Sequence, residues 1–179
     1  MSGPSLRAVV RGIAAAAAAT VVVVLVYGSV QQTYRTAADD PQAQLATDAA
    51  IALRSGTPVS AVVPRDTVSL AQGLAPFVIV YDSANRPIAG SGFLDGALPV
   101  PPPGVLEQAR RRGVNRVSWM PRRGIRMAAV LHGVDDASGR VVLAARSLRE
   151  VEERESRLLV MSALAWGALL VASVLAVVL

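Results

Sequence analysis

The sequence contains no cysteine, no lysine and a single histidine, His132. Without cysteine the chain has no disulfide, no thiolate nucleophile and no cysteine-ligated zinc. One histidine beside two turn acids, Asp135 and Asp136, is poor support for a catalytic triad or a metal site. A G-x-S-x-G motif is also missing, and a possible G-x-G-x-x-G loop at Gly90 has Asp95 where its third glycine belongs. The sequence therefore predicts no enzyme activity, no cofactor and no metal site.

Every basic residue is arginine, and the formal net charge is +5. Two of the 18 basic residues, Arg7 and Arg11, precede the first apolar run, which leaves 16 against 13 acidic residues. This excess of three is too small to predict nucleic acid as a partner.

Long uncharged runs are present at both ends of the chain, at Gly12–Tyr34 and Leu158–Leu179. A helix rises about 1.5 Å per residue, so the second run would extend roughly 33 Å and cross a hydrocarbon core of about 30 Å. The first run is longer than the apolar region of a signal peptide and has no clean A-x-A site after it. An uncleaved anchor is therefore favoured over a signal peptide.

Arg7 and Arg11 place the N-terminus in the cytoplasm by the positive-inside rule, and two spans return the C-terminus to the same side. The sequence thus predicts a two-pass protein of the plasma membrane with an extracytoplasmic centre. Its predicted segments are a cytoplasmic N-terminus (1–11), a first span (12–34), a central domain (35–146), an exit helix (147–157) and a second span (158–179).

The central domain reads as helix and sheet. A helix is expected at Pro41–Leu53, with Pro41 in its first turn, and a shorter one at Gly104–Arg112. Thr57–Gly73 has no clear pattern, and a strand or a short helix there is left open. The run PFVIVY, the turn DSANR and the run PIAGSG within Pro76–Gly92 predict a hairpin.

Three further strands are expected, separated by turns at Pro121–Gly124 and Asp135–Gly139. They are Val114–Trp119, Ile125–Val134 and Arg140–Arg146, each with alternating residue types. The predicted fold class is α+β: a five-stranded antiparallel sheet with helices on one face, flanked by two transmembrane helices.

Two stretches resemble a known family. FVIVYDSANRPIAGSG resembles the first hairpin of PAS-like and single-Cache sensor domains. GIRMAAVLHGVDDASGRVVLAARSLREVEERE resembles their last two strands and exit helix. The nearest likeness is to the extracytoplasmic sensor region of actinobacterial two-component histidine kinases. The resemblance implies a signal-sensing fold with a pocket beside the sheet.

This chain departs from such kinases because it stops at Leu179 without a phosphoacceptor histidine or an ATP-binding domain. By this interpretation it is a stand-alone sensor module, a truncated sequence, or a subunit that acts through a partner signalling protein.

A ligand site is hypothesised on one strand face. Arg126 and His132 share that face, Arg146 is expected nearby, and arginine beside an apolar pocket suits a carboxylate or another anion. The alternative is an outward face with ordinary ion pairs. Trp119 could form a platform for the ligand, but its alternation favours the core.

The exit helix is the predicted path for a signal. Glu150 and Arg154 form an i,i+4 pair in the favourable orientation. Leu148, Val151 and Leu158 make a sparse apolar stripe. A rigid lever into the membrane and a solvated connecting helix are both compatible with this pattern.

Two function classes follow. One is a membrane-anchored sensor module of a small ligand or envelope signal, acting as a homodimer or through a partner. The other is a two-span accessory or assembly protein that acts by protein–protein interaction. A ligand pocket would favour the first, and an exposed apolar patch the second.

Overall fold

The structure is a computed structural model that describes residues 6–178, with side chains in the two long helices described except at 6–9, 15, 30–31, 33–40, 155, 173 and 176–178. The first five residues of the predicted N-terminal segment, and Leu179, lie outside the described residues. The chain divides into two units: the terminal segments Met1–Arg35 and Val151–Leu179, and the central segment Thr36–Glu150. Each is described by itself.

The terminal unit contains the larger part of two long helices: α1 (Leu6–Arg54) as far as Arg35, and α4 (Arg149–Val178) from Val151 on. Each contains a range long and apolar enough to cross a membrane, Val10–Ser29 in α1 and Arg149–Ala172 in α4. The second range opens with seven charged residues up to Arg157, which hydrocarbon accepts poorly. Its part suited to a bilayer core therefore begins at Leu158, as the sequence predicts.

A polar contact between Trp166 and Thr20 joins the two helices of the terminal unit. The indole Nε1 of Trp166 donates to Oγ1 of Thr20 at 2.9 Å, and the same hydroxyl donates to the carbonyl of Ala16 at 2.8 Å. Both polar groups are thereby satisfied within the helix pair, which is what an apolar solvent requires.

The prediction that Pro41 starts a new helix is wrong, because α1 runs through it without a break. Proline inside a helix costs about 3 kcal/mol through a lost hydrogen bond and a steric clash. The buried face that follows it, Gln42, Ala46 and Ala50, packs on the sheet and holds the helix together.

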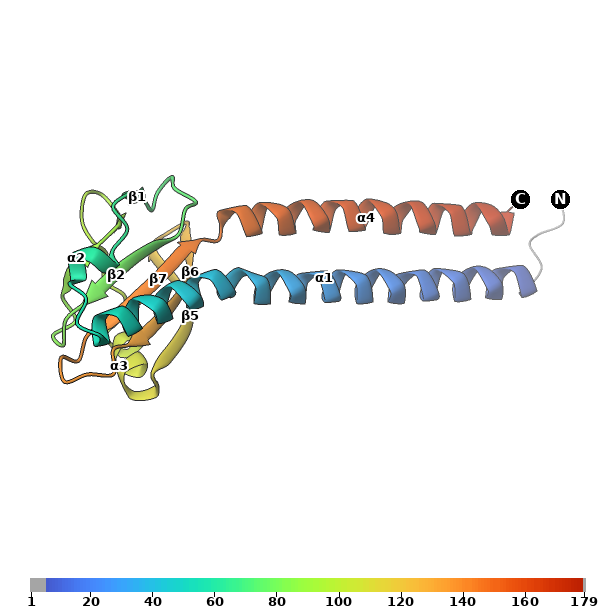
Figure 1. Ribbon diagram of the computed structural model, residues 1–179. Coiled ribbons are helices and arrows are strands. Elements are labelled where there is room, and N and C mark those ends of the chain that lie inside the picture. The colour runs from blue at the N-terminus through green and yellow to red at the C-terminus, as the bar shows by residue number, and fades with distance from the viewer. Residues whose placement is uncertain (1–5, 179) are drawn as a thin grey trace. The chain divides into compact units, whose positions relative to one another are not determined.

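The central unit is built on a five-stranded antiparallel sheet (Figure 1), which confirms the α+β prediction. Its order is β3-β2-β7-β6-β5. The strands are β2 (Phe77–Tyr81), β3 (Pro87–Gly90), β5 (Val114–Arg122), β6 (Ile125–Gly133) and β7 (Val141–Ser147). The predicted hairpin at Pro76–Gly92 is formed by β2 and β3.

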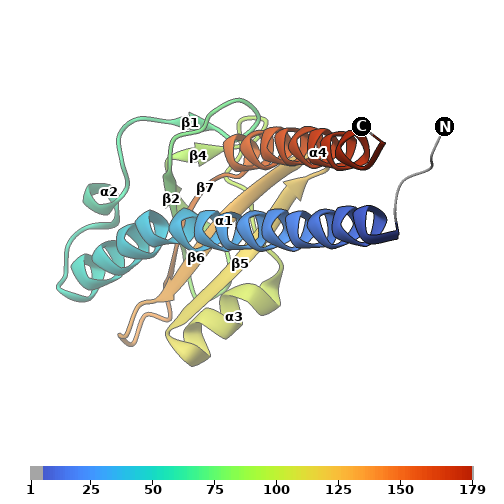
Figure 2. The ribbon, with the colours of Figure 1, turned by 90° about the vertical axis from the view of Figure 1, so that its right-hand side faces the viewer.

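The prediction that helices cover one face of the sheet is wrong, since both faces are covered. Phe77, Ile79 and Leu143 point into a core shared with helix α3 (Pro103–Arg112), which packs on β5 and β6 (Figure 2). Val80 and Val142 point into a second core shared with the end of α1. The central strands are apolar on both sides, and leaving either face in water would cost about 25 cal/mol per Å².

Two small strands and one short helix lie in stretches that the sequence pattern leaves open or treats as loop. Helix α2 is Val59–Val62, and β1 (Val68–Ser69) pairs in parallel with β4 (Gly92–Phe93). Strand β5 also continues beyond its predicted end at Trp119 into the predicted turn, as far as Arg122, through an irregularity in the ladder. Proline at position 121 is accommodated because β5 is an edge strand and the ladder shifts there.

Gly133 offers a test of how closely α3 packs on the sheet. An added Cβ would lie 2.8 Å from the carbonyl oxygen of Ala109 and 3.2 Å from Cα of Arg110, both in the backbone of α3. We expect Gly133→Ala to destabilise the central unit by about 1–3 kcal/mol, because the helix must move. Urea unfolding of the full chain in detergent micelles measures this.

Gly104→Ala is the matched control, since nothing lies within 4 Å of its added Cβ. Its stability should stay within about 0.5 kcal/mol of the parent. Equal stability of the two variants would contradict the close contact of α3.

Candidate functional site

The structure brings together only part of the ligand site expected from the sequence. Arg146 lies opposite Ala128 in the β6–β7 register, so Arg126 is its diagonal neighbour on the face that α1 covers. His132 lies four residues further along β6, roughly 13 Å from Ala128. Trp119 pairs with Met127 and is buried in the core on the opposite face. The alternative reading of Trp119 as a core residue is therefore confirmed.

These side chains also have contacts of their own. Nη2 of Arg146 pairs with Oε2 of Glu150 at 3.0 Å, and Nδ1 of His132 lies 2.8 Å from the carbonyl oxygen of Gly133. The buried Nε of Arg146 has no hydrogen-bond partner among the residues that the structure describes. A ligand on this face stays a hypothesis, and Arg146 already pairs with Glu150.

A hollow of about 470 Å³ lies at the small parallel sheet, on the other side of the central unit. One wall is the segment around β1 and the other is β4 with the turn after it. Its lining mixes hydroxyl, amide and carboxylate groups with apolar ones: Thr67, Val68, Ser69, Ala71, Gln72, Phe93, Asp95 and Gly96. This volume falls within the range of small-molecule sites. None of the four residues expected to bind a ligand lines it.

Each wall of the hollow is held by backbone bonds and by one arginine from another element. Between the walls, the N–H of Val68 donates to Ser91 at 2.7 Å and that of Leu70 to Phe93 at 2.8 Å. Nη1 of Arg122, at the end of β5, donates to both carboxylate oxygens of Asp95 at 3.1 and 2.8 Å.

The other wall is held by the exit helix. Nη2 of Arg149, the first residue of α4, donates to the carbonyl oxygen of Ala71 at 2.5 Å. Ala71 lines the hollow, so the hollow and the start of α4 share one hydrogen bond.

The junction between β7 and α4 is fastened to the sheet. The N–H of Leu148 donates to the carbonyl of Arg126 at 2.9 Å, and the N–H of Arg149 to Oγ of Ser147 at 3.3 Å. The Arg146–Glu150 ion pair spans the junction. From here α4 continues without interruption through Val151, Arg154 and Leu158, so the predicted exit helix and second span are parts of one helix.

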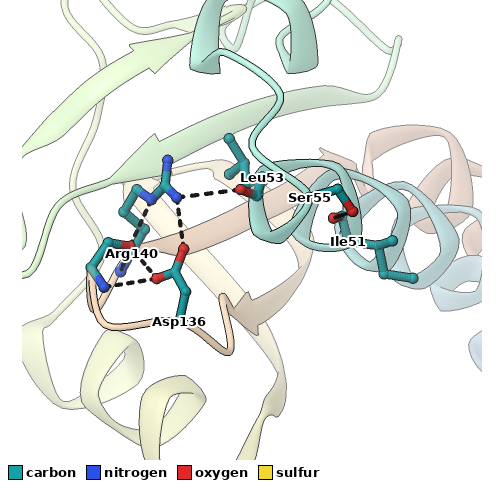
Figure 3. Close-up of polar contacts among 6 residues, drawn as sticks. Ile51, Leu53, Ser55, Asp136 and Arg140 are labelled. Carbon is teal, nitrogen blue, oxygen red and sulfur yellow. Dashed lines mark hydrogen bonds and ion pairs between the residues drawn. The ribbon is translucent and has the colours of Figure 1, made fainter.

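The opposite end of the sheet is fastened by arginine side chains, of which Arg140 is shown in Figure 3. Arg140 reaches Oδ2 of Asp136 at 2.7 Å, Oγ of Ser138 at 2.7 Å and the carbonyl of Leu53 at 3.4 Å, so it ties the β6–β7 turn to the end of α1. Arg110 of α3 ties the same turn to the β2–β3 turn, through the carbonyls of Gly139 and Asp82, both at 2.8 Å.

Two carboxyl groups in these turns are stabilised in their charged form. Hydrogen bonds from Ser138, followed by the guanidinium of Arg140, hold the pKa of Asp136 below its usual value despite partial desolvation. The backbone N–H and then the side chain of Arg86 likewise lower the pKa of Asp82.

Comparisons with models of protein families, with curated proteins and with solved structures gave no match to this chain. The candidate site is therefore argued from its own geometry. Of the residues around the hollow, only the Asp95-Gly96 pair carries a recognisable sequence signal, that of a turn. Arg149 and Ala71 are 78 positions apart, and no periodicity relates them.

Asp136→Asn tests the turn that holds α1. The pKa of Asp136 is lower in the folded chain than in the unfolded one. Its charged carboxylate therefore adds to the free energy of unfolding above the unfolded pKa of about 3.9, and this contribution is lost as the pH falls through the folded pKa. At pH 7 we expect the variant to lose about 0.5–1 kcal/mol, a figure already reduced for solvent screening. Thermal unfolding at pH 7 and pH 3 measures the difference, which should shrink at pH 3.

Asp66→Asn, at an exposed carboxylate away from this network, should leave stability nearly unchanged at both pH values. An Asp136→Asn effect of equal size at pH 3 would show that the carboxylate charge is not its source.

Proposed function

We propose that this chain is a membrane-anchored, extracytoplasmic sensor module of the PAS/Cache-like kind, which binds a small ligand and passes the signal through α4 into its second span. The observation that carries the proposal is the shared hydrogen bond between the wall of the hollow and the first residue of α4. A binding site and an output helix that meet in this way are the two parts a sensor needs.

The sheet supports the PAS-like assignment. The first and last strands of the five, β2 and β7, are neighbours at its centre, and the second and third strands, β3 and β5, form opposite edges. This is the strand order of a PAS-like sheet. The final central strand runs directly into the output helix, so a displacement of β7 has a short covalent path out of the domain.

Membrane anchoring is supported by two candidate spans with polar groups paired internally. The arginines before the first span favour a cytoplasmic N-terminus. In this arrangement both termini are cytoplasmic, the central unit faces outward, and the bilayer is an obligatory partner. A second copy of the chain or a partner signalling protein would then receive the output.

The topology can be tested by cysteine labelling, because the natural chain has no cysteine. Ala137→Cys introduces a thiol at an exposed turn of the central unit, and Ser5→Cys introduces one before the first span. In intact cells we expect a membrane-impermeant maleimide to label position 137 and to reach position 5 only after the cells are opened. The reverse pattern would place the central unit in the cytoplasm and remove the extracytoplasmic proposal.

Ligand binding can be tested by a thermal-shift screen of the full chain in detergent against amino acids, sugars, amines, organic acids and metal ions. A bound ligand at 100 times its dissociation constant stabilises the native state by about 2.7 kcal/mol. We expect at least one compound to raise the melting temperature, and Gln72→Ala to reduce that shift. Arg126→Ala and His132→Ala in parallel test the strand face favoured by the sequence.

Loss of the shift in the Arg126 or His132 variant alone would move the site to that face. No shift across the panel, from protein shown to be folded, would favour the accessory or assembly protein that acts by protein–protein interaction.

A further inference from the structure

The proposed function leaves open which ligand is bound and how binding reaches α4. Resting on that function, we infer that the hollow at β1 and β4 takes a small neutral or cationic molecule with hydrogen-bonding groups, and that Arg149 transmits its occupancy by holding the carbonyl of Ala71.

The charge of the lining sets the ligand class. Among the described residues that line the hollow, Asp95 is the one with an ionisable side chain. Arg122 compensates much of its charge, but each carboxylate oxygen has a further lone pair, so an ammonium or hydroxyl group of a ligand would find an acceptor, which an anion could not use. Thr67, Ser69 and Gln72 supply further polar groups. The chemistry is thus opposite to the anion site that the arginines of the sheet suggest.

Asp95 is also kept in place from outside the hollow. Arg122 holds it from one side, and its backbone has a positive φ of 52°, which fixes a tight turn with Gly96. The wall that contains Asp95 therefore serves as the fixed side of the site.

The opposite wall is suited to move. It is a short turn in which Gln72 and Gly73 both donate to the carbonyl of Ser69, at 3.2 and 2.6 Å. Leu70 is fully buried and anchors one end, so a ligand that separates the walls displaces Ala71 and Gln72 around that anchor. Short segments with few ladder bonds open at low free energy.

Arg149 converts that displacement into motion of the helix. Its guanidinium holds Ala71, its own N–H is bound by Ser147, and the next residue pairs back to Arg146. The first turn of α4 is therefore attached both to the movable wall and to β7. A ligand that favours one position of the wall shifts the population of α4 positions by its differential affinity.

The test uses the absence of natural cysteine. Ser69→Cys puts one thiol in the wall of the hollow, and Ser60→Cys puts one at an exposed position of α2 as the matched control. Three methanethiosulfonate reagents of similar size then attach a neutral methyl, a cationic aminoethyl or an anionic sulfonatoethyl group by a mixed disulfide. Hydrogen exchange of the amides of 149–157 is measured in the full chain in detergent micelles.

The measured quantity is the modification rate with the cationic reagent divided by the rate with the anionic reagent. We expect this ratio to be larger at position 69 than at position 60. Asp95→Asn should make the two ratios equal. The cationic and neutral groups at position 69 should change exchange at 149–157 by about fivefold or more, the lower end of ordinary coupling between sites. Position 60 should give no such change.

Arg149→Ala should remove the effect of the tethered group, and Arg149→Lys, which keeps a charged donor, should restore part of it. An undiminished effect in Arg149→Ala would overturn the role of Arg149, and no effect from a folded, fully modified protein would overturn the coupling. Faster modification by the anionic reagent would overturn the ligand class.

If Ser69→Cys fails to fold, Gln72→Cys provides the same measurement from the same wall. The topology and thermal-shift experiments decide the proposed function separately. If those two experiments confirm a sensor but modification at position 69 leaves hydrogen exchange at 149–157 unchanged, this inference alone is refuted. If the central unit proves to be cytoplasmic, the proposed function is refuted whatever the hydrogen exchange shows.

Discussion

The central unit depends on one constraint: the two middle strands, β2 and β7, are apolar on both faces. Five consecutive residues of β2 are buried, and β7 is buried from Val141 to Ala145. A sheet of this kind is stable in water only if both faces are covered. Helix α3 covers one face and the last turns of α1 cover the other. Because α1 also contains a candidate span, the same helix that completes the core would connect it to a membrane.

Arginine is the residue that ties the elements together in this chain without lysine. Arg110 and Arg140 bind backbone carbonyls at the turn end of the sheet, and Arg149 binds one at the exit end. A planar guanidinium offers five donors and can hold two segments at once, which an ammonium does less well. These contacts join segments that are distant in sequence and have no regular pairing.

The sequence pattern predicts the elements with strong periodicity and misses those without it. FVIVY followed by DSANR gives the hairpin, and alternation gives the two faces of β6 and β7. The sequence also contained the signal for helices on both faces of the sheet. Val142 and Ala144, on one face of β7, are as apolar as Val141, Leu143 and Ala145 on the other. Strands β1 and β4 have two residues each, too few for any period. The candidate site lies there, so its geometry came from tertiary contacts alone.

The distribution of these hydrogen bonds indicates which end of the domain a bound ligand could displace. At the turn end, two arginines link α1, α3 and both hairpin turns, so a displacement there would break several hydrogen bonds together. At the exit end, the wall of the hollow meets α4 through the side chain of Arg149. A ligand supplies limited differential binding energy, and it acts most effectively where few bonds must be exchanged. Under the proposed function, a displacement of Ala71 would therefore reach α4 through the side chain of Arg149, at the end of the sheet from which α4 leaves.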